Sequence, residues 1–471
     1  MKKLGAGKAG GTIHNDGTAQ KNFISADYLL FANHFTKKHL LEDCYVDDLV
    51  KGKALMLGYP RTGAMLDENK RREVRKELAP YDEKIMAFMP TYRGEEQQQE
   101  QMREIKELLD SLDKQLSEKQ LVYVNLHHKM EGGIEYGRYR HIRRFPSVLD
   151  TYEVLCAADC LCTDYSSLMF DFAVTGRKII LYCPDLEEYQ AARGIYLDMK
   201  ELPFPKTKNC SELMEEFHTD KNYDDSKFLR TFCSYDDAAN AERFCRSMFL
   251  NDFRDVQIEE LDTRKKDLIL LYSDGWSPGL ATECMYEMAE SGSLKDHVYL
   301  SYKDSQVNAN LDSAYPLLCY FRSVGKGKQL FTGEQKQIYR RYRNGTIEFA
   351  AAMQELQPAY VAEQKRIYDR AGFSTMILYD TIDADKILAI CNFTGCRKYL
   401  FLQEALVCLL EEQNQYIKDA VAYFCENGDG ICTLSESLAH RGGAYVTKPI
   451  TVLPGVRDLE QFLSECLKHD W

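Results

Sequence analysis

The sequence predicts an α/β protein that contains Rossmann-like halves, each built on a parallel sheet. Short apolar runs typical of buried strands alternate with helix-like segments, which is the pattern of βαβ units. The length of 471 residues is sufficient for about two to four domains. A composition of 45% hydrophobic and 28% charged residues supplies enough apolar material for packed cores and excludes wholesale disorder.

Residues 1–80 are predicted to hold two short strands and two helices. The apolar runs 26–32 and 54–60 are typical of buried strands, and residues 35–43 between them are helix-like. Residues 67–78 are predicted to form a charged helix that ends before two turn residues.

A more regular alternation follows in residues 81–250, which are predicted to form one Rossmann-like domain. Its strands are expected at 85–90, 121–126, 160–163 and 178–182. Its helices are expected at 95–118, near 148–149, at 167–175 and at 236–249.

The charged segment 251–266 is interpreted as a linker, and residues 267–471 as a second Rossmann-like domain. Its strands are expected at 267–272, 298–301, 375–378, 386–390 and 444–446, with a glycine-bearing loop at 273–279 and a helix at 281–291.

Charge and cysteine content limit the function classes. The net charge of −13 disfavours general nucleic-acid binding. The 16 cysteines show no framework spacing and the amino terminus lacks a signal-peptide pattern, so reduced thiols and a cytoplasmic location are expected. Cys160 and Cys162 lack a second pair at zinc-ligand spacing, so no metal is expected. No apolar stretch approaches the roughly 18 to 20 residues that span a bilayer, so only peripheral membrane contact is expected.

Ligands of open parallel sheets bind outside the carboxyl ends of the strands, so polar residues there are candidates. Arg93 follows the first strand of 81–250 and could hold a phosphate; the alternative is an exposed, solvated charge. His127 follows the second strand and could act as an acid or base or bind a phosphate; the alternative is a structural histidine. The adjacent His128 is not expected to share a metal with it, because neighbours on a strand point to opposite faces.

The sharpest candidate lies between a strand and a helix and comprises Thr163, Asp164, Ser166 and Ser167. Hydroxyls at this place cap the helix, and the N–H groups of its first turn form an anion site. Capping without any ligand is the alternative. The later pair Arg193-Gly194 would be an ordinary loop if taken alone.

The order of these segments resembles the CDP-glycerol:poly(glycerophosphate) glycerophosphotransferase family, the teichoic acid polymerases and primases. The matching segments are Gly58-Tyr59-Pro60-Arg61, Pro90-Thr91-Tyr92-Arg93, Leu126-His127, the block 163–172, and 193–198. The block 163–172 is the most specific, and the resemblance covers roughly residues 20–250.

This resemblance implies a GT-B fold with the nucleotide donor in the carboxyl-terminal half and without a metal or other cofactor. His127 would be the catalytic histidine beside the donor phosphates. The expected donor-binding residues are Arg93, Thr163, Asp164, Ser166, Ser167, Arg193 and Gly194. The reaction implied moves glycerol phosphate, or a related polyol phosphate, from CDP-glycerol to a teichoic acid or capsular polymer hydroxyl and releases CMP. The acceptor would be lipid-linked, at the cytoplasmic face of the membrane.

One family segment has no full counterpart here. It reads tryptophan-histidine-glycine-threonine-proline, and its histidine is the expected general base. The chain starts Met1-Lys2-Lys3-Leu4-Gly5, which resembles the end of that segment, so residues 1–80 are expected to be the remnant of an incomplete acceptor half. A separate polypeptide could supply the rest. His14 and His34 stand outside the motif, and His128 stands where proline is usual.

Residues 267–471 more faintly resemble the amino-terminal half of capsule-type glycosyltransferases, through 272–282 and 390–395. A degenerate or interaction domain is the alternative for this region. Two rival functions also stay open for the whole chain. One is a non-catalytic nucleotide-binding or partner subunit of a split transferase, and the other is a sugar-nucleotide glycosyltransferase.

Overall fold

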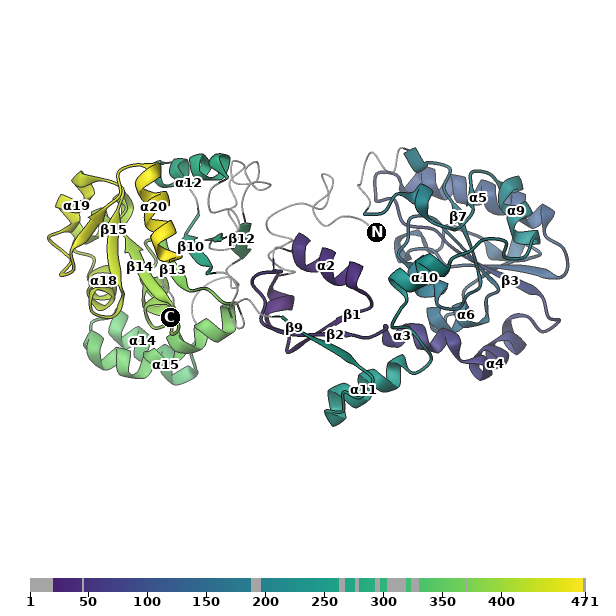
Figure 1. Cartoon of the computed structure of the whole chain (residues 1–471), viewed down its shortest axis with the longest axis horizontal. Coiled ribbons are helices and arrows are strands. Elements are labelled where there is room, and N and C mark those ends of the chain that lie inside the picture. Colours follow the sequence, from purple (N-terminus) through teal and green to yellow (C-terminus); the bar gives the residue numbers. More distant parts are fainter. Residues whose placement is uncertain are drawn as a thin grey trace. The chain divides into compact units, whose positions relative to one another are not determined.

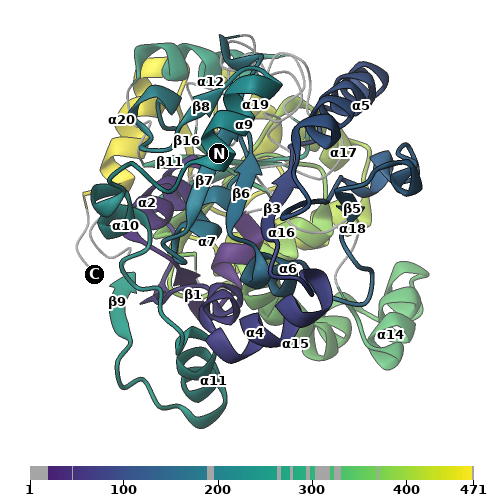
Figure 2. The ribbon, with the colours of Figure 1, turned by 90° about the vertical axis from the view of Figure 1, so that its right-hand side faces the viewer.

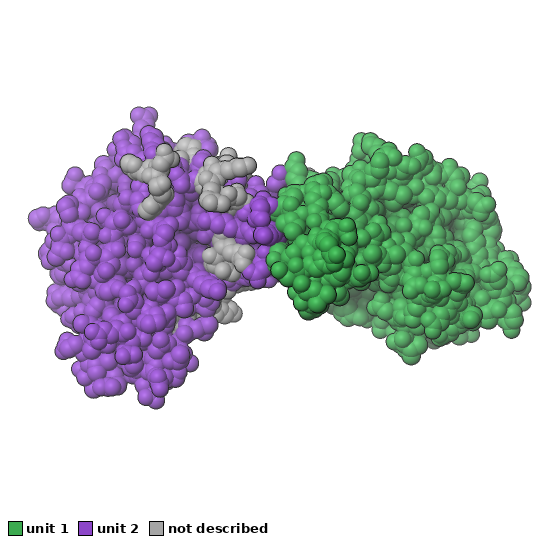
Figure 3. All heavy atoms as spheres, turned by 60° about the horizontal axis from the view of Figure 1, so that its bottom comes forward, with its two compact units in different colours: residues 1–9, 28–40, 54–259 green, residues 10–27, 41–53, 260–471 purple. Residues whose placement is uncertain are grey.

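The computed structural model describes residues 20–44, 46–187, 196–261, 267–275, 279–292, 297–302, 319–322, 330–368 and 371–468. These residues form two compact units, which are coloured separately in Figure 3. The first unit holds residues 28–40 and 54–259, and the second holds 20–27, 41–53 and 260–468. Each unit is described by itself.

The first unit is built on a six-stranded sheet with the order β5-β4-β3-β6-β7-β8, in which every neighbouring pair is parallel (Figure 2). The strands are β3 (Lys84–Met89), β4 (Gln120–Val124), β5 (Ile142–Arg144), β6 (Cys160–Thr163), β7 (Lys178–Tyr182) and β8 (Lys206–Thr207). The chain runs outward from β3 in one direction and from β6 in the other. The boundary between β3 and β6 is therefore a topological switch point, where such sheets bind ligands.

Helices cover both faces of this sheet. One face carries α5 (Gln98–Gln115) and α9 (Cys210–His218), and the other carries α4 (Glu68–Leu78), α6 (Thr151–Ala157), α7 (Leu168–Ala173) and α10 (Ser226–Phe232). The alternation of strand side chains explains the two cores. Met86 and Phe88 pack under α5 and α9, whereas Ile85 and Ala87 pack under the other helices. Both faces are apolar because both are covered.

The remaining elements of this part of the chain are short. A three-stranded sheet has the order β1-β2-β9. The elements are β1 (Tyr28–Phe31), α2 (His34–Asp43), β2 (Gly52–Met56), α3 (Pro60–Gly63), α11 (Asn240–Leu250), β9 (Gln257–Leu261) and 3-10 turns at Ala64–Leu66, His128–Met130, Tyr136–Arg138 and Met199–Glu201. The segment 251–266, which was predicted to be a linker, contains strand β9, and this strand pairs with β2.

The second unit contains a seven-stranded parallel sheet with the order β12-β11-β10-β13-β14-β15-β16 (Figure 1). Its strands are β10 (Ile269–Ser273), β11 (Val298–Tyr302), β12 (Cys319–Arg322), β13 (Thr375–Asp380), β14 (Arg397–Phe401), β15 (Gly430–Thr433) and β16 (Ile450–Val452). Its helices are α12 (Leu280–Ser291), α14 (Gly333–Arg343), α15 (Phe349–Ile367), α16 (Ala384–Cys391), α17 (Glu404–Glu411), α18 (Gln415–Asn427), α19 (Glu436–Gly442) and α20 (Val456–Cys466). The predicted α/β class with parallel sheets is confirmed in both units.

Two strands predicted for the second unit are wrong. Residues 386–390 belong to helix α16, which begins where the Asp383 side chain caps the Lys386 N–H, and most of the helix is buried. A short apolar run has the same periodicity in a buried helix as in a strand. Residues 444–446 follow α19 as a turn, and the next strand is β16. Of the predicted loop 273–279, residues 276–278 lie outside the described residues.

Across the described ranges, we find no helix whose length and apolar character would allow it to cross a membrane.

Asp159 links α4 to the strands of the first unit and yields a stability test. Its carboxylate accepts hydrogen bonds from Arg71 and Arg75, both at 2.8 Å, and from the Ile85 N–H at 2.9 Å. We expect Asp159→Asn to reduce the local free energy of unfolding by about 2 kcal/mol, because hydrogen bonds to charged groups contribute about 1.5–3 kcal/mol. Hydrogen exchange of β3 and β6 peptides, measured by mass spectrometry, gives this quantity.

Asp82→Asn is the matched control, because Asp82 also pairs with Arg75 but is 95% exposed. Asparagine tolerates the positive φ of 60° at this position. The control should leave exchange unchanged, since exposed ion pairs contribute little. Equal effects of the two variants would contradict the linking role of Asp159.

Candidate functional site

Asp164 stands at the switch point of the first sheet, directly after β6, and its side chain is only 4% exposed. The carboxylate accepts hydrogen bonds from the Thr91 N–H at 2.9 and 3.0 Å and from the Thr91 hydroxyl at 2.5 Å. It also accepts one from the Tyr165 N–H at 2.6 Å. Asp164 therefore ties the segment after β3 to the end of β6, across the point where ligands of this architecture bind.

Arg93 approaches the same carboxylate. Its Nη2 lies 3.3 Å from Asp164 Oδ2 and 3.1 Å from Asp185 Oδ1, and its guanidinium lies 4.8 Å from the ring centroid of Tyr165. The Tyr165 hydroxyl donates to Asp185 at 2.9 Å. The Arg93 side chain is 13% exposed, so its alternative interpretation as an exposed, solvated charge is wrong.

Burial raises the pKa of Asp164 above its ordinary value, while the Arg93 charge and the hydrogen bonds from Thr91 oppose that rise. Desolvation is the larger effect, because the carboxylate has lost almost all contact with water. The pair thus places a buried negative charge and a nearly buried cation at the carboxyl edge of the sheet.

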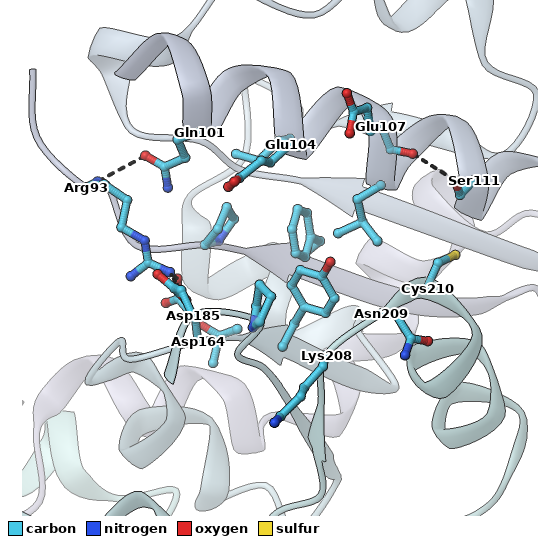
Figure 4. Close-up of a pocket in the computed structure, with 17 residues that line it drawn as sticks. Arg93, Gln101, Glu104, Glu107, Ser111, Asp164, Asp185, Lys208, Asn209 and Cys210 are labelled. Carbon is cyan, nitrogen blue, oxygen red and sulfur yellow. Dashed lines mark hydrogen bonds and ion pairs between the residues drawn. The ribbon is translucent and has the colours of Figure 1, made fainter. Parts of the chain in front are cut away.

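A cavity of about 340 Å³ opens beside this pair (Figure 4). Arg93, Asp164 and Asp185 gather at one end of it, and Lys208, Asn209 and Cys210 stand near the start of α9 at the other. Helix α5 forms a further wall with residues between 101 and 111.

His127 follows β4 and begins a 3-10 turn with its side chain exposed. Its ring stacks on Tyr92, with centroids 4.6 Å apart and planes 9° from parallel. Its Nδ1 accepts a hydrogen bond from the Lys129 N–H at 3.3 Å, which leaves Nε2 to carry the proton of the neutral ring. Desolvation lowers the pKa of His127, and the neighbouring His128 and Lys129 lower it further. Because Tyr92 precedes Arg93, the stack brings the two predicted strand ends together.

The hydroxyl residues after β6 have different environments. Ser166 Oγ accepts from the Leu168 N–H at 3.2 Å, so it caps α7 as the ligand-free alternative describes. Thr163 is buried and donates to the Met89 carbonyl at 2.6 Å, which joins the ends of β6 and β3. Ser167 makes no capping hydrogen bond and is exposed. Helix α7 has six residues, so its first turn is a large part of the whole helix.

Two of the predicted donor-binding residues, Arg193 and Gly194, lie outside the described residues, as does His14. Where the chain is described, no group of three or more His, Cys, Asp or Glu side chains could hold a metal ion.

The model of the family CDP-Glycerol:Poly(glycerophosphate) glycerophosphotransferase matches residues 1–250, which is more than half of the chain. The chain belongs to this family. The family match contains every residue predicted for the site, whereas most of the second unit lies beyond it. The resemblance that the sequence motifs indicated is thereby confirmed.

Curated relatives match the same half of the chain. A teichoic acid poly(glycerol phosphate) polymerase of Staphylococcus epidermidis is 26% identical over 49% of this chain and 33% of its own length. A teichoic acid glycerol-phosphate transferase of Staphylococcus aureus is 28% identical over 47% and 60%. A teichoic acid glycerol-phosphate primase of Bacillus subtilis is 29% identical over 47% and 57%. The chain thus spans a third to three fifths of the length of these relatives.

Among solved structures, the chain is similar to the wall teichoic acid polymerase TagF. The two are 24% identical with a TM-score of 0.43, over 52% of this chain and 62% of that one.

The family segments 58–61 and 163–172 are joined by a contact that sequence reasoning did not assign. Arg61 Nε lies 3.0 Å from Asp171 Oδ2, and Nη2 lies 3.3 Å from Oδ1. The Tyr152 hydroxyl donates to the same carboxylate at 2.6 Å. Both residues stand in family motifs, which is the only signal that could have pointed to them, because 110 positions separate them in the chain. Tyr92 and Asp185 were also missed as neighbours of His127 and Arg93.

The raised pKa of Asp164 predicts how the stability of the first unit depends on pH. The folded chain binds the proton of Asp164 more tightly than the unfolded chain does. The resulting contribution to the free energy of unfolding is therefore fully present below the unfolded pKa of about 3.9. It is lost as the pH rises through the higher folded pKa. Wild type should therefore lose stability relative to Asp164→Asn over that window in urea titrations. A difference that does not vary with pH would contradict this cause.

Proposed function

We propose that the chain transfers glycerol phosphate, or a related polyol phosphate, from a CDP-activated donor to a hydroxyl of a teichoic acid or related polymer and releases CMP. The observation that carries this proposal is the convergence of the family motifs at one sheet edge. Asp164 binds Thr91, Arg93 pairs with Asp164, and Tyr92 stacks on His127. Membership of the family and the names of the curated relatives support the same reaction.

The donor site of this proposal lies in the domain 81–250, at the carboxyl ends of β3, β4 and β6. Transfer breaks the bond between the two donor phosphates, so negative charge grows on the departing CMP. His127 would donate a hydrogen bond from Nε2 to that charge, and Arg93 would contribute positive potential behind it. Ser167 would contact the donor phosphates through its hydroxyl, which makes no capping hydrogen bond to α7. Arg193 and Gly194 belong to the same proposed set by their motif alone.

We extend the proposal to a lipid-linked acceptor at the cytoplasmic face of the membrane. The chain would reach this acceptor through peripheral contact with the membrane. Teichoic acid is named as the polymer of the curated relatives in both glycerol and ribitol forms. The polyol is therefore proposed as glycerol with ribitol as the closest competitor.

A donor screen tests the proposed reaction. Calorimetry on the full chain should show binding of CDP-glycerol and CMP, and weaker binding of CDP-ribitol and UDP-sugars. Release of CMP from CDP-glycerol should follow in the presence of a glycerol phosphate oligomer. Preference for a UDP-sugar would instead support a sugar-nucleotide glycosyltransferase. Binding without any turnover would support a non-catalytic nucleotide-binding subunit.

His127→Ala should reduce turnover of CDP-glycerol by about 10²- to 10³-fold, because it removes a donor to charge that develops in the transition state. The exposed position of His127 means that the free energy of unfolding should change little. His128→Ala is the matched control, since it removes the neighbouring exposed imidazole, and its effect should be much smaller. Equal rates in His127→Ala and wild type would assign His127 a structural role only.

A further inference from the structure

The first unit contains a second cavity of about 350 Å³, separate in its lining from the one beside Arg93. It lies where α2, the segment around α3, the start of α7 and the residues before α11 come together. The lining side chains that matter here are Phe35, His39, Arg61, Ser167, Tyr196 and Asp236. Its volume falls in the range of about 300–1,000 Å³ that small-molecule sites occupy.

Edge-on and tilted contacts with two aromatic rings hold His39 in the wall of this cavity. Its ring centroid lies 4.6 Å from that of Tyr196 and 4.3 Å from that of Phe35. Phe35 in turn packs on Phe232 at 5.3 Å. The structure shows no hydrogen bond from either ring nitrogen of His39 to any residue that it describes. The ring is therefore fixed in position while its nitrogens remain available to a molecule in the cavity.

The charged groups in the same cavity already serve structural contacts. Arg61 on α3 pairs with Asp171 on α7 at 3.0 Å. Asp236, which precedes α11, accepts from the Thr62 hydroxyl at 2.7 Å through Oδ1, and desolvation raises its pKa. Tyr59 also lines the cavity, but desolvation raises the pKa of its phenol and so opposes its use as a base. Among the described carboxylate, guanidinium and imidazole groups that face the cavity, His39 is thus the one without a partner to displace.

We propose that this cavity holds the hydroxyl-bearing acceptor and that His39 is the general base that deprotonates it; the inference rests on the function proposed above. Ser167 lines the cavity and stands at the start of α7, where the donor phosphates are proposed to bind. An acceptor in the cavity therefore lies next to the phosphorus that is transferred. The aromatic walls suit the carbon face of a polyol or sugar, and histidine is the usual proton acceptor at neutral pH.

The step balances without a further reactant. Neutral His39 takes the proton of the acceptor hydroxyl, whose oxygen forms a bond to the phosphorus of glycerol phosphate. The bond from that phosphorus to the bridging oxygen breaks, and CMP leaves with the electron pair. The imidazolium of His39 then returns its proton to solvent. His127 and His39 accordingly act on opposite partners, the first on the leaving group and the second on the attacking hydroxyl.

The test uses the full chain with CDP-glycerol and a synthetic glycerol phosphate oligomer, and it measures CMP release and oligomer extension. His39→Ala should lower kcat for extension by about 10²- to 10⁴-fold, as expected for loss of a general base. The Kd for CDP-glycerol should stay at the wild-type value, and added imidazole should restore part of the rate. His34→Ala is the matched control, because His34 lies on the same helix but does not line the cavity.

His39→Gln, which keeps most of the side-chain volume, should fold like wild type and show the same loss of kcat. Extension by His39→Ala at the rate of His34→Ala would overturn the assignment, as would a loss in both His39 variants that imidazole does not restore. Wild type that binds CDP-glycerol but does not extend the oligomer would also overturn it, while leaving the donor site in place. Wild type that does not bind CDP-glycerol would instead overturn the proposed function itself.

Discussion

The buried carboxylate of Asp164 is the constraint on which the geometry of the proposed donor site depends. A carboxylate without water is stable only when donors in the protein replace it. Thr91 and Tyr165 supply those donors, and Arg93 supplies the opposite charge. Because Thr91 comes directly before Tyr92, its position also fixes the direction in which the chain leaves β3. The stacked ring of His127 therefore depends on Asp164, although it follows a different strand.

The contacts that define the site join segments that are far apart in the chain. Asp164 meets Thr91 across 73 positions, and Arg61 meets Asp171 across 110. Each pair spans the switch point or links α3 to α7, so sheet topology brings the partners together. A parallel sheet whose strand order reverses places these loops at one edge, where ligands of such sheets bind.

The periodicity of apolar residues and the positions of strand ends explain which elements and site residues could be predicted from the sequence. Strands such as β3 and β6 were found because they are short, apolar and followed by turn residues, whereas 386–390 was mistaken for a strand because a fully buried helix has the same pattern. Arg93 and His127 were predicted as site residues because they follow strands. Their partners Asp185 and Tyr92 were not, because stacking and ion pairs between loops leave no local pattern. Ser166 was predicted as a donor-binding residue, and in this structure its hydroxyl accepts a hydrogen bond from the Leu168 N–H.

Because helix α7 is short, side chains would supply most of the electrostatic stabilisation in the proposed reaction. Six residues give a smaller macrodipole than a long helix does, and the Ser166 hydroxyl is already engaged. Stabilisation of the negative charge that grows on the departing CMP would then depend chiefly on His127 and Arg93. Desolvation and the neighbouring His128 and Lys129 lower the pKa of His127, which favours the neutral ring. In the proposed reaction, His127 would therefore stabilise that charge by a directed hydrogen bond and not by a net charge. Moderate salt screens exposed charges but not such a contact, so the contribution of His127 to turnover should persist as ionic strength rises.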